Sequence, residues 1–121
     1  MPEKKIVLII DDNKGVRELL REFMKVHGFD AHCIDNGISA LNLLKEAHFD
    51  IIITDYSMPE MNGIEFTKAA RAQCPCTLII GMSGNSNGSD FLMAGADAFL
   101  SKPLQLQELL SVCWSKNQKN I

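Results

Sequence analysis

The sequence has no long hydrophobic run. Its longest uninterrupted apolar stretch is Ile6 to Ile10, whereas a membrane-spanning helix needs about 20 apolar residues and a signal-peptide core about 7–15. We therefore expect no membrane partner and predict a cytoplasmic protein. An excess of positive charge is also missing, since the formal net charge is −3 at pH 7. Because nucleic-acid binding relies on cations that neutralise phosphates, no direct contact with nucleic acid is expected.

Paired metal-binding motifs are missing as well. Cys74 and Cys76 are one residue apart, but the other two cysteines form no second pair of the kind that a structural zinc site needs. We interpret all four cysteines as reduced thiols. The histidines show no metal-binding spacing and are predicted to be surface or half-buried residues: His27, His32 and His48.

What the sequence does have is the composition of one globular domain. Its 121 residues fall in the usual range of about 100–150 for a single domain. An apolar content of 46% and a charged content of 22% are ordinary for a globular protein. We predict a single domain over residues 1–121, with a core at about 5–115 and a polar tail at 116–121.

Five short segments are predicted to be strands; the one at 30–35 has a weaker pattern than the others. In the most informative one, residues 50–55, three isoleucines and a threonine lead to Asp55, and Pro59 then turns the chain. A segment that is apolar on both faces is typical of a buried strand in a parallel sheet. The other strands are predicted at 6–10, 30–35, 77–82 and 98–101.

Helical patterns follow each of these strands. From Asn13 to Val26 or His27 the apolar residues fall on one face, and Gly28 is placed to cap the C-terminus. The remaining helices are predicted from the Asn36–Gly37 turn to Ala47, at 64–73, at 89–94 and at 104–114. The helix at 89–94 is short, because residues 84–88 are Gly, Asn and Ser, which favour turns.

Five strand–helix repeats predict an α/β fold, in which right-handed crossovers place helices on both faces of a parallel sheet. We take the flavodoxin-like strand order 2-1-3-4-5 as the expected one. This choice rests on the family resemblance described below and not on the residues alone. In this order the first and third strands are neighbours.

Side chains that can bind an ion or take part in a reaction follow four of the strands. Asp11 and Asp12 follow the first, Asp55 the third, Ser83 the fourth and Lys102 the fifth. Parallel strands end at one edge of the sheet, so these groups are expected to converge. Neighbouring carboxylates oppose each other's ionisation, and a cation with oxygen ligands, usually Mg²⁺ near phosphate, relieves this. Each residue alone could be a helix cap or turn residue, but the joint pattern favours a functional site.

On these residues the sequence resembles a receiver domain of bacterial two-component response regulators, in particular the stand-alone type found in chemotaxis. The resemblance covers nearly the whole chain. It is carried by Asp11-Asp12, Asp55 with Met58-Pro59 and Gly63, Ser83, Gly95-Ala96-Asp97, Phe99 and Lys102-Pro103.

The resemblance implies a phosphoacceptor switch. Asp55 would take a phosphoryl group from the phosphohistidine of a sensor histidine kinase or a histidine phosphotransfer protein. Lys102 would pair with Asp55, and its bond to Pro103 would be cis. The chain would catalyse only its own phosphorylation and slow autodephosphorylation. The Mg²⁺ ligands would be Asp11, Asp12, Asp55 and the backbone carbonyl of Ser57.

The resemblance also implies how the signal is read. Ser83 would swing toward the phosphoryl group, and Phe99 would turn inward. The surface around the fourth helix, fifth strand and fifth helix would then change and alter binding to a downstream target protein. Two features depart from the family pattern: the interval from Ser83 to Lys102 is short, and Phe99 lacks the hydroxyl of the tyrosine often found there.

Two alternative functions fit the sequence less well. A binding module with the same fold could act without phosphorylation, but the complete acid set with Ser83 and Lys102 speaks against it. An aspartate-dependent phosphatase would need a second acid two residues after its nucleophile, and that position is Ser57.

Overall fold

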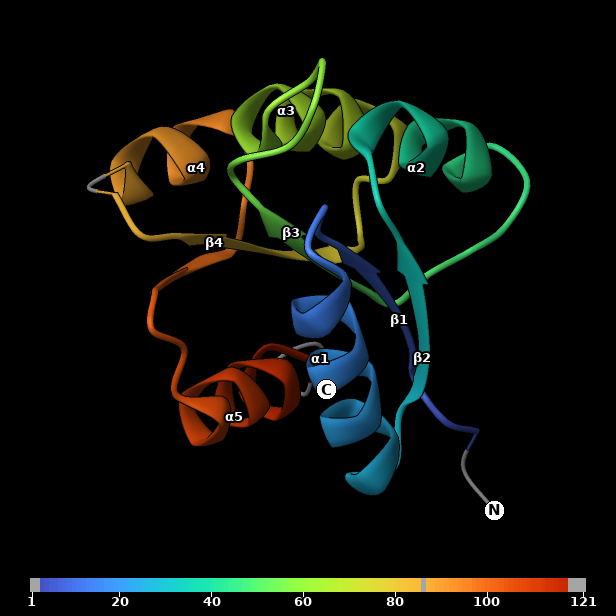
Figure 1. Ribbon diagram of the computed structural model, residues 1–121. Coiled ribbons are helices and arrows are strands. Elements are labelled where there is room, and N and C mark those ends of the chain that lie inside the picture. The colour runs from blue at the N-terminus through green and yellow to red at the C-terminus, as the bar shows by residue number, and fades with distance from the viewer. Residues whose placement is uncertain (1–2, 86, 118–121) are drawn as a thin grey trace.

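A five-stranded parallel sheet forms the middle layer of the structure, a computed structural model that describes residues 3–85 and 87–117 (Figure 1). In chain order the elements of these residues are β1 (Ile6–Ile10), α1 (Lys14–Val26), β2 (Asp30–Ile34), α2 (Gly37–Leu44), β3 (Ile51–Asp55), α3 (Gly63–Gln73), β4 (Leu78–Ser83), α4 (Gly88–Ala94), β5 (Ala98–Ser101) and α5 (Leu106–Asn117).

The strand order is β2-β1-β3-β4-β5, and every neighbouring pair is parallel. The helices lie on both faces, with α1 and α5 on one side and α2, α3 and α4 on the other (Figure 1). This confirms the predicted flavodoxin-like fold and the short fourth helix. None of the helices within residues 3–85 and 87–117 is long and apolar enough to cross a membrane.

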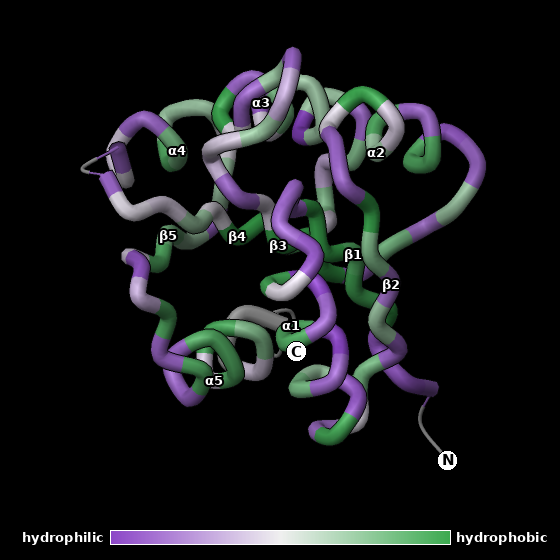
Figure 2. The backbone as a smooth tube through the Cα atoms, viewed as in Figure 1, coloured by the Kyte–Doolittle hydropathy of each residue, from purple (hydrophilic) through white to green (hydrophobic). Residues whose placement is uncertain are grey.

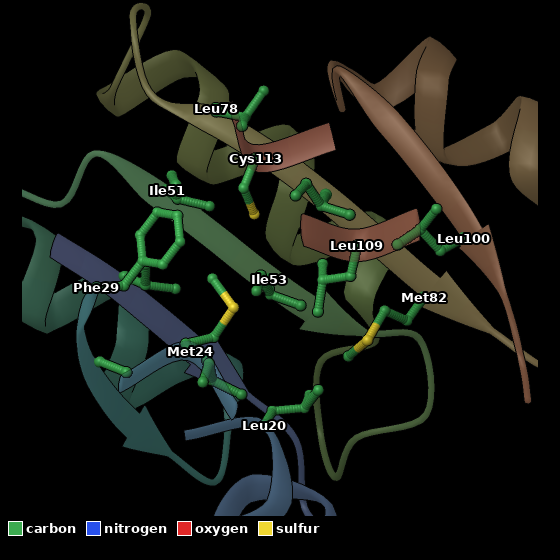
Figure 3. Packing of buried hydrophobic residues seen from close by; sticks show 14 residues of the cluster. Leu20, Met24, Phe29, Ile51, Ile53, Leu78, Met82, Leu100, Leu109 and Cys113 are labelled. Carbon is green, nitrogen blue, oxygen red and sulfur yellow. The ribbon is translucent and has the colours of Figure 1, made fainter. Parts of the chain in front are cut away.

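The sheet has a hydrophobic core on each face, because successive residues of a strand point to opposite sides. Ile9 and Ile53 belong to the core under α1 and α5 (Figure 3), whereas Leu8 and Ile52 belong to the core under α2, α3 and α4. All four side chains are fully buried. The central strands are accordingly hydrophobic along their length (Figure 2), which is what the uninterrupted apolar segments predicted.

The predicted helix ends are partly correct. Asn13 caps α1 by accepting a hydrogen bond from the backbone N–H of Val16, and Gly28 adopts a positive φ of 92° just after the helix. The prediction that the second helix reaches Ala47 is wrong. It ends at Leu44, because the backbone N–H groups of the next two residues bond three residues back and tighten the last turn.

The last helix was also misplaced. It begins at Leu106 and not at 104, because its first backbone hydrogen bonds are made to the carbonyl of Gln105. It continues to Asn117 rather than ending at 114, so the helix enters the predicted polar tail. Residues 118–121 of that tail lie outside the described residues.

Arg71 fastens the end of α3 to the turn before β5. Its Nη1 donates to carbonyl oxygens within the 74–77 turn, its Nε donates to the Gly95 carbonyl at 2.9 Å, and its Nη2 lies 2.6 Å from the Asp97 carboxylate. The same Asp97 oxygen accepts the N–H of Ile79. One guanidinium therefore fixes β4 and the α4–β5 turn relative to each other.

The histidines are half-buried or exposed, as predicted. None of the cysteines forms a disulfide bond. Within the described part of the chain, no group of metal-ligating side chains includes a cysteine or a histidine. His27 is half-buried, and His32 and His48 are exposed.

Candidate functional site

The carboxyl edge of the sheet brings together the predicted site residues. Asp11 follows β1 directly and Asp55 is the last residue of β3, and these two strands are neighbours. Ser83 ends β4, and Lys102 follows β5. The backbone N–H of Lys102 donates to the carbonyl of Ser83 at 2.9 Å, which ties the ends of the last two strands together.

Three carboxylates share one notch at this edge. One oxygen atom from each of Asp11, Asp12 and Asp55 lies within 4.8 Å of the other two. Asp11 is 1% exposed and Asp55 is 4% exposed, while Asp12 is open to solvent. The notch is therefore a mostly buried acidic site whose entrance is on the Asp12 side.

Asp11 has one carboxylate oxygen that is buried without a hydrogen-bond partner. Its Oδ1 accepts a hydrogen bond from the backbone N–H of Asn13 at 2.9 Å, but its Oδ2 is buried and has no hydrogen-bond partner. The nearest cation, Lys102, is 3.9 Å from that oxygen. Burial is the main cause that raises the pKa of Asp11, and the neighbouring Asp55 raises it further.

Lys102 pairs with the predicted phosphoacceptor. Its Nζ is 2.7 Å from Oδ1 of Asp55, and about a third of the lysine side chain is exposed. The peptide bond between Lys102 and Pro103 is cis, as the resemblance implied. The lysine is therefore closer to Asp55 than to Asp11, whose Oδ2 lies 3.9 Å from its Nζ.

Three hydrogen bonds hold the backbone around Asp55. The hydroxyl of Thr54 donates to the Asp55 carbonyl at 3.0 Å, and the backbone N–H of Tyr56 donates to the Met82 carbonyl at 2.9 Å. Gly63 donates its N–H to the Tyr56 carbonyl at 2.8 Å. It approaches so closely that a Cβ at position 63 would overlap the backbone carbonyl of Asp55, so only glycine fits there.

The two predicted switch residues lie outside the acid cluster. Ser83 is buried, and its Oγ accepts a hydrogen bond from the backbone N–H of Asn85 at 3.0 Å. Phe99 is half-buried and packs against Phe91, with ring centroids 5.7 Å apart. Ser57 is exposed in the loop after β3, and the role of its carbonyl as a metal ligand stays a prediction.

Arg17 is a site residue that the sequence reasoning missed. Its Nη1 donates to the backbone carbonyl of Asp11 at 2.8 Å, so it braces the turn that presents Asp11 and Asp12. The sequence gives little warning of this contact, because an arginine in the first turns of an amphipathic helix is ordinarily a solvated residue.

The arrangement fits a hard divalent cation. Carboxylate oxygens are the ligands that Mg²⁺ prefers, and an ion of that charge would supply the partner that the buried Oδ2 of Asp11 lacks. The residues able to hold it are Asp11, Asp12 and Asp55.

A parallel sheet in this order, with an acidic notch and a paired lysine at its carboxyl edge, is the arrangement of a receiver domain. The sequence profile of the response regulator receiver domain matches residues 7–113. The chain belongs to this family, whose members generally bind Mg²⁺ at an acidic pocket.

Individual relatives agree with this assignment. The regulatory protein AtoC of Escherichia coli is 35% identical over 106 residues, which are 85% of this chain and 23% of AtoC. The sensor protein EvgS of the same species is 35% identical over 112 residues, which are 90% of this chain and 9% of EvgS. This chain therefore spans less than a quarter of either relative.

Solved structures show the same fold. The chemotaxis response regulator CheY4 of Vibrio cholerae has a TM-score of 0.85 and 29% sequence identity, and the match covers 93% of this chain and 98% of that one. The fold comparison thus extends over almost the entire length of both chains.

Proposed function

We propose that this receiver domain is a phosphoacceptor switch in which Asp55 accepts a phosphoryl group from a phosphohistidine. The observation that carries the proposal is the pairing of Asp55 with Lys102 at 2.7 Å inside a cluster of three acids. An aspartate held by a cation in a notch open to solvent on one side can act as a nucleophile toward phosphorus. The domain would catalyse no reaction other than its own phosphorylation and slow autodephosphorylation.

The acids of the notch have separate tasks in this proposal. Asp11 and Asp12 would hold Mg²⁺ together with Asp55 and the carbonyl of Ser57. When bound, the cation reduces the repulsion between the anionic donor and the anionic acceptor. Arg17 supports this set indirectly, because it fixes the backbone of Asp11.

Transfer itself forms one bond and breaks one. A carboxylate oxygen of Asp55 attacks phosphorus, the bond between phosphorus and the imidazole nitrogen of the donor breaks, and the electron pair stays on that nitrogen, which then takes a proton. Lys102 would release the carboxylate oxygen and neutralise charge on a phosphoryl oxygen. Because its Nζ already lies beside Asp55, little movement is required.

The new phosphoryl group would be detected by Ser83. Its hydroxyl is engaged by the backbone of Asn85, so phosphorylation would have to draw it away from that loop. A dianion with three acceptor oxygens can do so by accepting the hydroxyl hydrogen. The loop and α4 would then shift, and a downstream target protein would bind one of the two forms more tightly.

The phosphoryl donor is proposed to be a sensor histidine kinase or a histidine phosphotransfer protein. An apolar hollow of about 250 Å³ lies beside Lys102, lined by three residues of α1 and four of segment 102–106. Leu19 on its rim is 59% exposed. A helix carrying the phosphohistidine could bury apolar side chains here while its imidazole faces Asp55. A cytoplasmic location stays a prediction.

Phosphorylation by a small donor tests the function. The protein is incubated with acetyl phosphate and Mg²⁺, and its intact mass is measured. We expect the wild type to gain the mass of one phosphoryl group, and Asp55→Asn or treatment with EDTA to abolish the gain. Absence of an adduct on the wild type would contradict the proposal and leave the phosphorylation-independent binding module as the better explanation.

A separate variant tests whether the phosphoryl donor binds at the apolar hollow beside Lys102. Leu19→Glu places a charge in the apolar hollow but leaves the acids untouched. We expect this variant to accept phosphate from acetyl phosphate at the wild-type rate and to lose about tenfold or more of its rate with a phosphorylated histidine kinase that serves the wild type. Equal rates with the kinase would place the donor elsewhere.

A further inference from the structure

Phe91 lies at the centre of a column of aromatic rings that links the acceptor loop to β5. Its side chain is fully buried under α4. The ring of Tyr56, the residue after Asp55, meets it edge-on at a centroid distance of 6.4 Å. On its other side Phe99 of β5 packs against it at 5.7 Å with an interplanar angle of 31°.

Gly81 makes room for this ring. It lies in the middle of β4, in register with Thr54 of β3 and with Phe99 of β5. A Cβ at position 81 would overlap the ring of Phe91. The ring of Phe91 therefore occupies the space that a side chain at position 81 would otherwise fill.

The inward side of Phe99 is consequently occupied. The ring of Phe91 packs against it, and Gly88 at the start of α4 lies so close that a Cβ there would meet the ring of Phe99 at 2.6 Å. Phe99 cannot turn inward unless Phe91 and the helix that carries it are displaced, because protein interiors leave no spare volume for a second ring.

Arg71 holds the C-terminal end of α4 through the Gly95 carbonyl, but the N-terminal end of the helix is held only weakly. The helix has seven residues, and its N-cap residue Asn87 makes no capping hydrogen bond with its side chain. The Asn87 Oδ1 is buried without a hydrogen-bond partner. Leu92 and Met93, which follow Phe91, are 50% and 86% exposed. Within the described part of this helix, the ring of Phe91 is thus the only fully buried side chain.

We propose that Phe91, seated over Gly81, is the residue that couples α4 to the state of Asp55. In this scheme the helix, Phe91 and Phe99 shift as one body, and Leu92 and Met93 carry the change to the surface. Phe91 is a positioning residue, since it would act through the rings of Tyr56 and Phe99 that it packs against. The coupling rests on the proposed phosphoacceptor function, but the fit of Phe91 over Gly81 does not.

The fit is tested without any phosphoryl donor. Gly81→Ala forces the ring out, and amide hydrogen exchange over residues 88–94 is expected to accelerate by about tenfold or more. Gly84→Ala is the matched control, because a Cβ there meets nothing within 4 Å. Adding Phe91→Leu to Gly81→Ala restores the volume and should return exchange to the wild-type rate. If Gly81→Ala fails to fold, the double variant should fold again.

Two results would contradict the packing of Phe91 over Gly81. In the first, amide exchange in Gly81→Ala equals that of the wild type. In the second, the double variant recovers neither the wild-type exchange rate nor folding. Either would mean that Phe91 does not anchor α4 through position 81.

The coupling is tested with beryllium fluoride and Mg²⁺ as the phosphoryl mimic. Tyr56 is the only tyrosine, so 3-fluorotyrosine gives one ¹⁹F resonance beside Asp55 that reports binding. We expect wild type and Phe91→Leu both to bind, and the resulting exchange change over 88–94 to be roughly threefold or more smaller in the variant. An equal change in both would overturn the coupling. No binding by the wild type would overturn the coupling together with the phosphoacceptor function, whereas binding with equal exchange changes would overturn the coupling alone.

Discussion

Replacing Asp11 by asparagine is expected to stabilise the metal-free protein. The carboxylate is buried, its Oδ2 has no hydrogen-bond partner, and two further acids lie in the same notch. An asparagine keeps the acceptor that the backbone N–H of Asn13 uses. It replaces the Oδ2 that lacks a hydrogen-bond partner by a neutral amide group.

The size of this stabilisation follows from the cost of burying Oδ2 of Asp11 without a hydrogen-bond partner. A buried polar group without a partner costs about 1–3 kcal/mol, and more when it is charged. For a domain of this size each kcal/mol shifts the melting temperature by roughly 4 °C. We therefore expect Asp11→Asn to melt about 4–12 °C above the wild type in EDTA at neutral pH.

The pH dependence has a definite sign. Because burial raises the pKa of Asp11 in the folded state, the folded protein holds this proton more tightly than the unfolded chain does. Wild-type stability should fall as pH rises from the ordinary carboxyl pKa of about 3.9 to the raised value, where the penalty is complete. The advantage of Asp11→Asn should vanish at low pH and grow across that interval.

Mg²⁺ should reverse the order of stability. At 1,000 times the dissociation constant the wild type gains about 4.1 kcal/mol by binding the cation, which exceeds its deficit of about 1–3 kcal/mol, whereas the variant has lost a ligand. Melting curves in EDTA and in Mg²⁺ give both differences, with Asp12→Asn as an exposed control. The reasoning is refuted if Asp11→Asn is less stable than the wild type in EDTA, or if Mg²⁺ stabilises both equally.

Three further predictions concern other parts of the chain. Lys102→Met should slow phosphorylation of Asp55 by acetyl phosphate by about a hundredfold without weakening Mg²⁺ binding, and a normal rate would contradict the role of the ion pair. Gly63→Ala should lower the free energy of unfolding by about 1–3 kcal/mol in urea titrations, because its Cβ overlaps the Asp55 carbonyl; an unchanged midpoint would refute the packing argument. Burial raises the pKa of Cys113 to about 12, so a thiol reagent at pH 8 should label exposed Cys76 first and Cys113 only after unfolding, a result that early labelling of Cys113 would contradict.

The three central strands β1, β3 and β4 were predictable because each is apolar enough to be recognised without its neighbours. Residues 6–10 and 51–55 can be buried on both faces only in the centre of a parallel sheet, and the acid that follows each one is then carried to the same edge. The convergence of Asp11, Asp12 and Asp55 also needs β1 and β3 to be neighbours, and that strand order was expected only from the family resemblance.

Helix ends and cross-chain contacts were harder to predict. The end of α2 at Leu44 depends on a tightened last turn, which no residue between 44 and 47 signals. The contact of Phe91 with Gly81 joins residues from a helix and a strand, and neither pattern names its partner. Arg71, which bonds to both Gly95 and the 74–77 turn, is likewise an unremarkable helical arginine until the fold is known.

The most direct measurement locates the phosphoryl group. After incubation with acetyl phosphate and Mg²⁺, borohydride reduces an aspartyl phosphate to homoserine, and peptide sequencing by mass spectrometry identifies the position. We predict homoserine at residue 55 alone, and none when EDTA is present. Homoserine at Asp11 or Asp12, or its absence from every peptide of the wild type, would contradict the assignment of the acceptor.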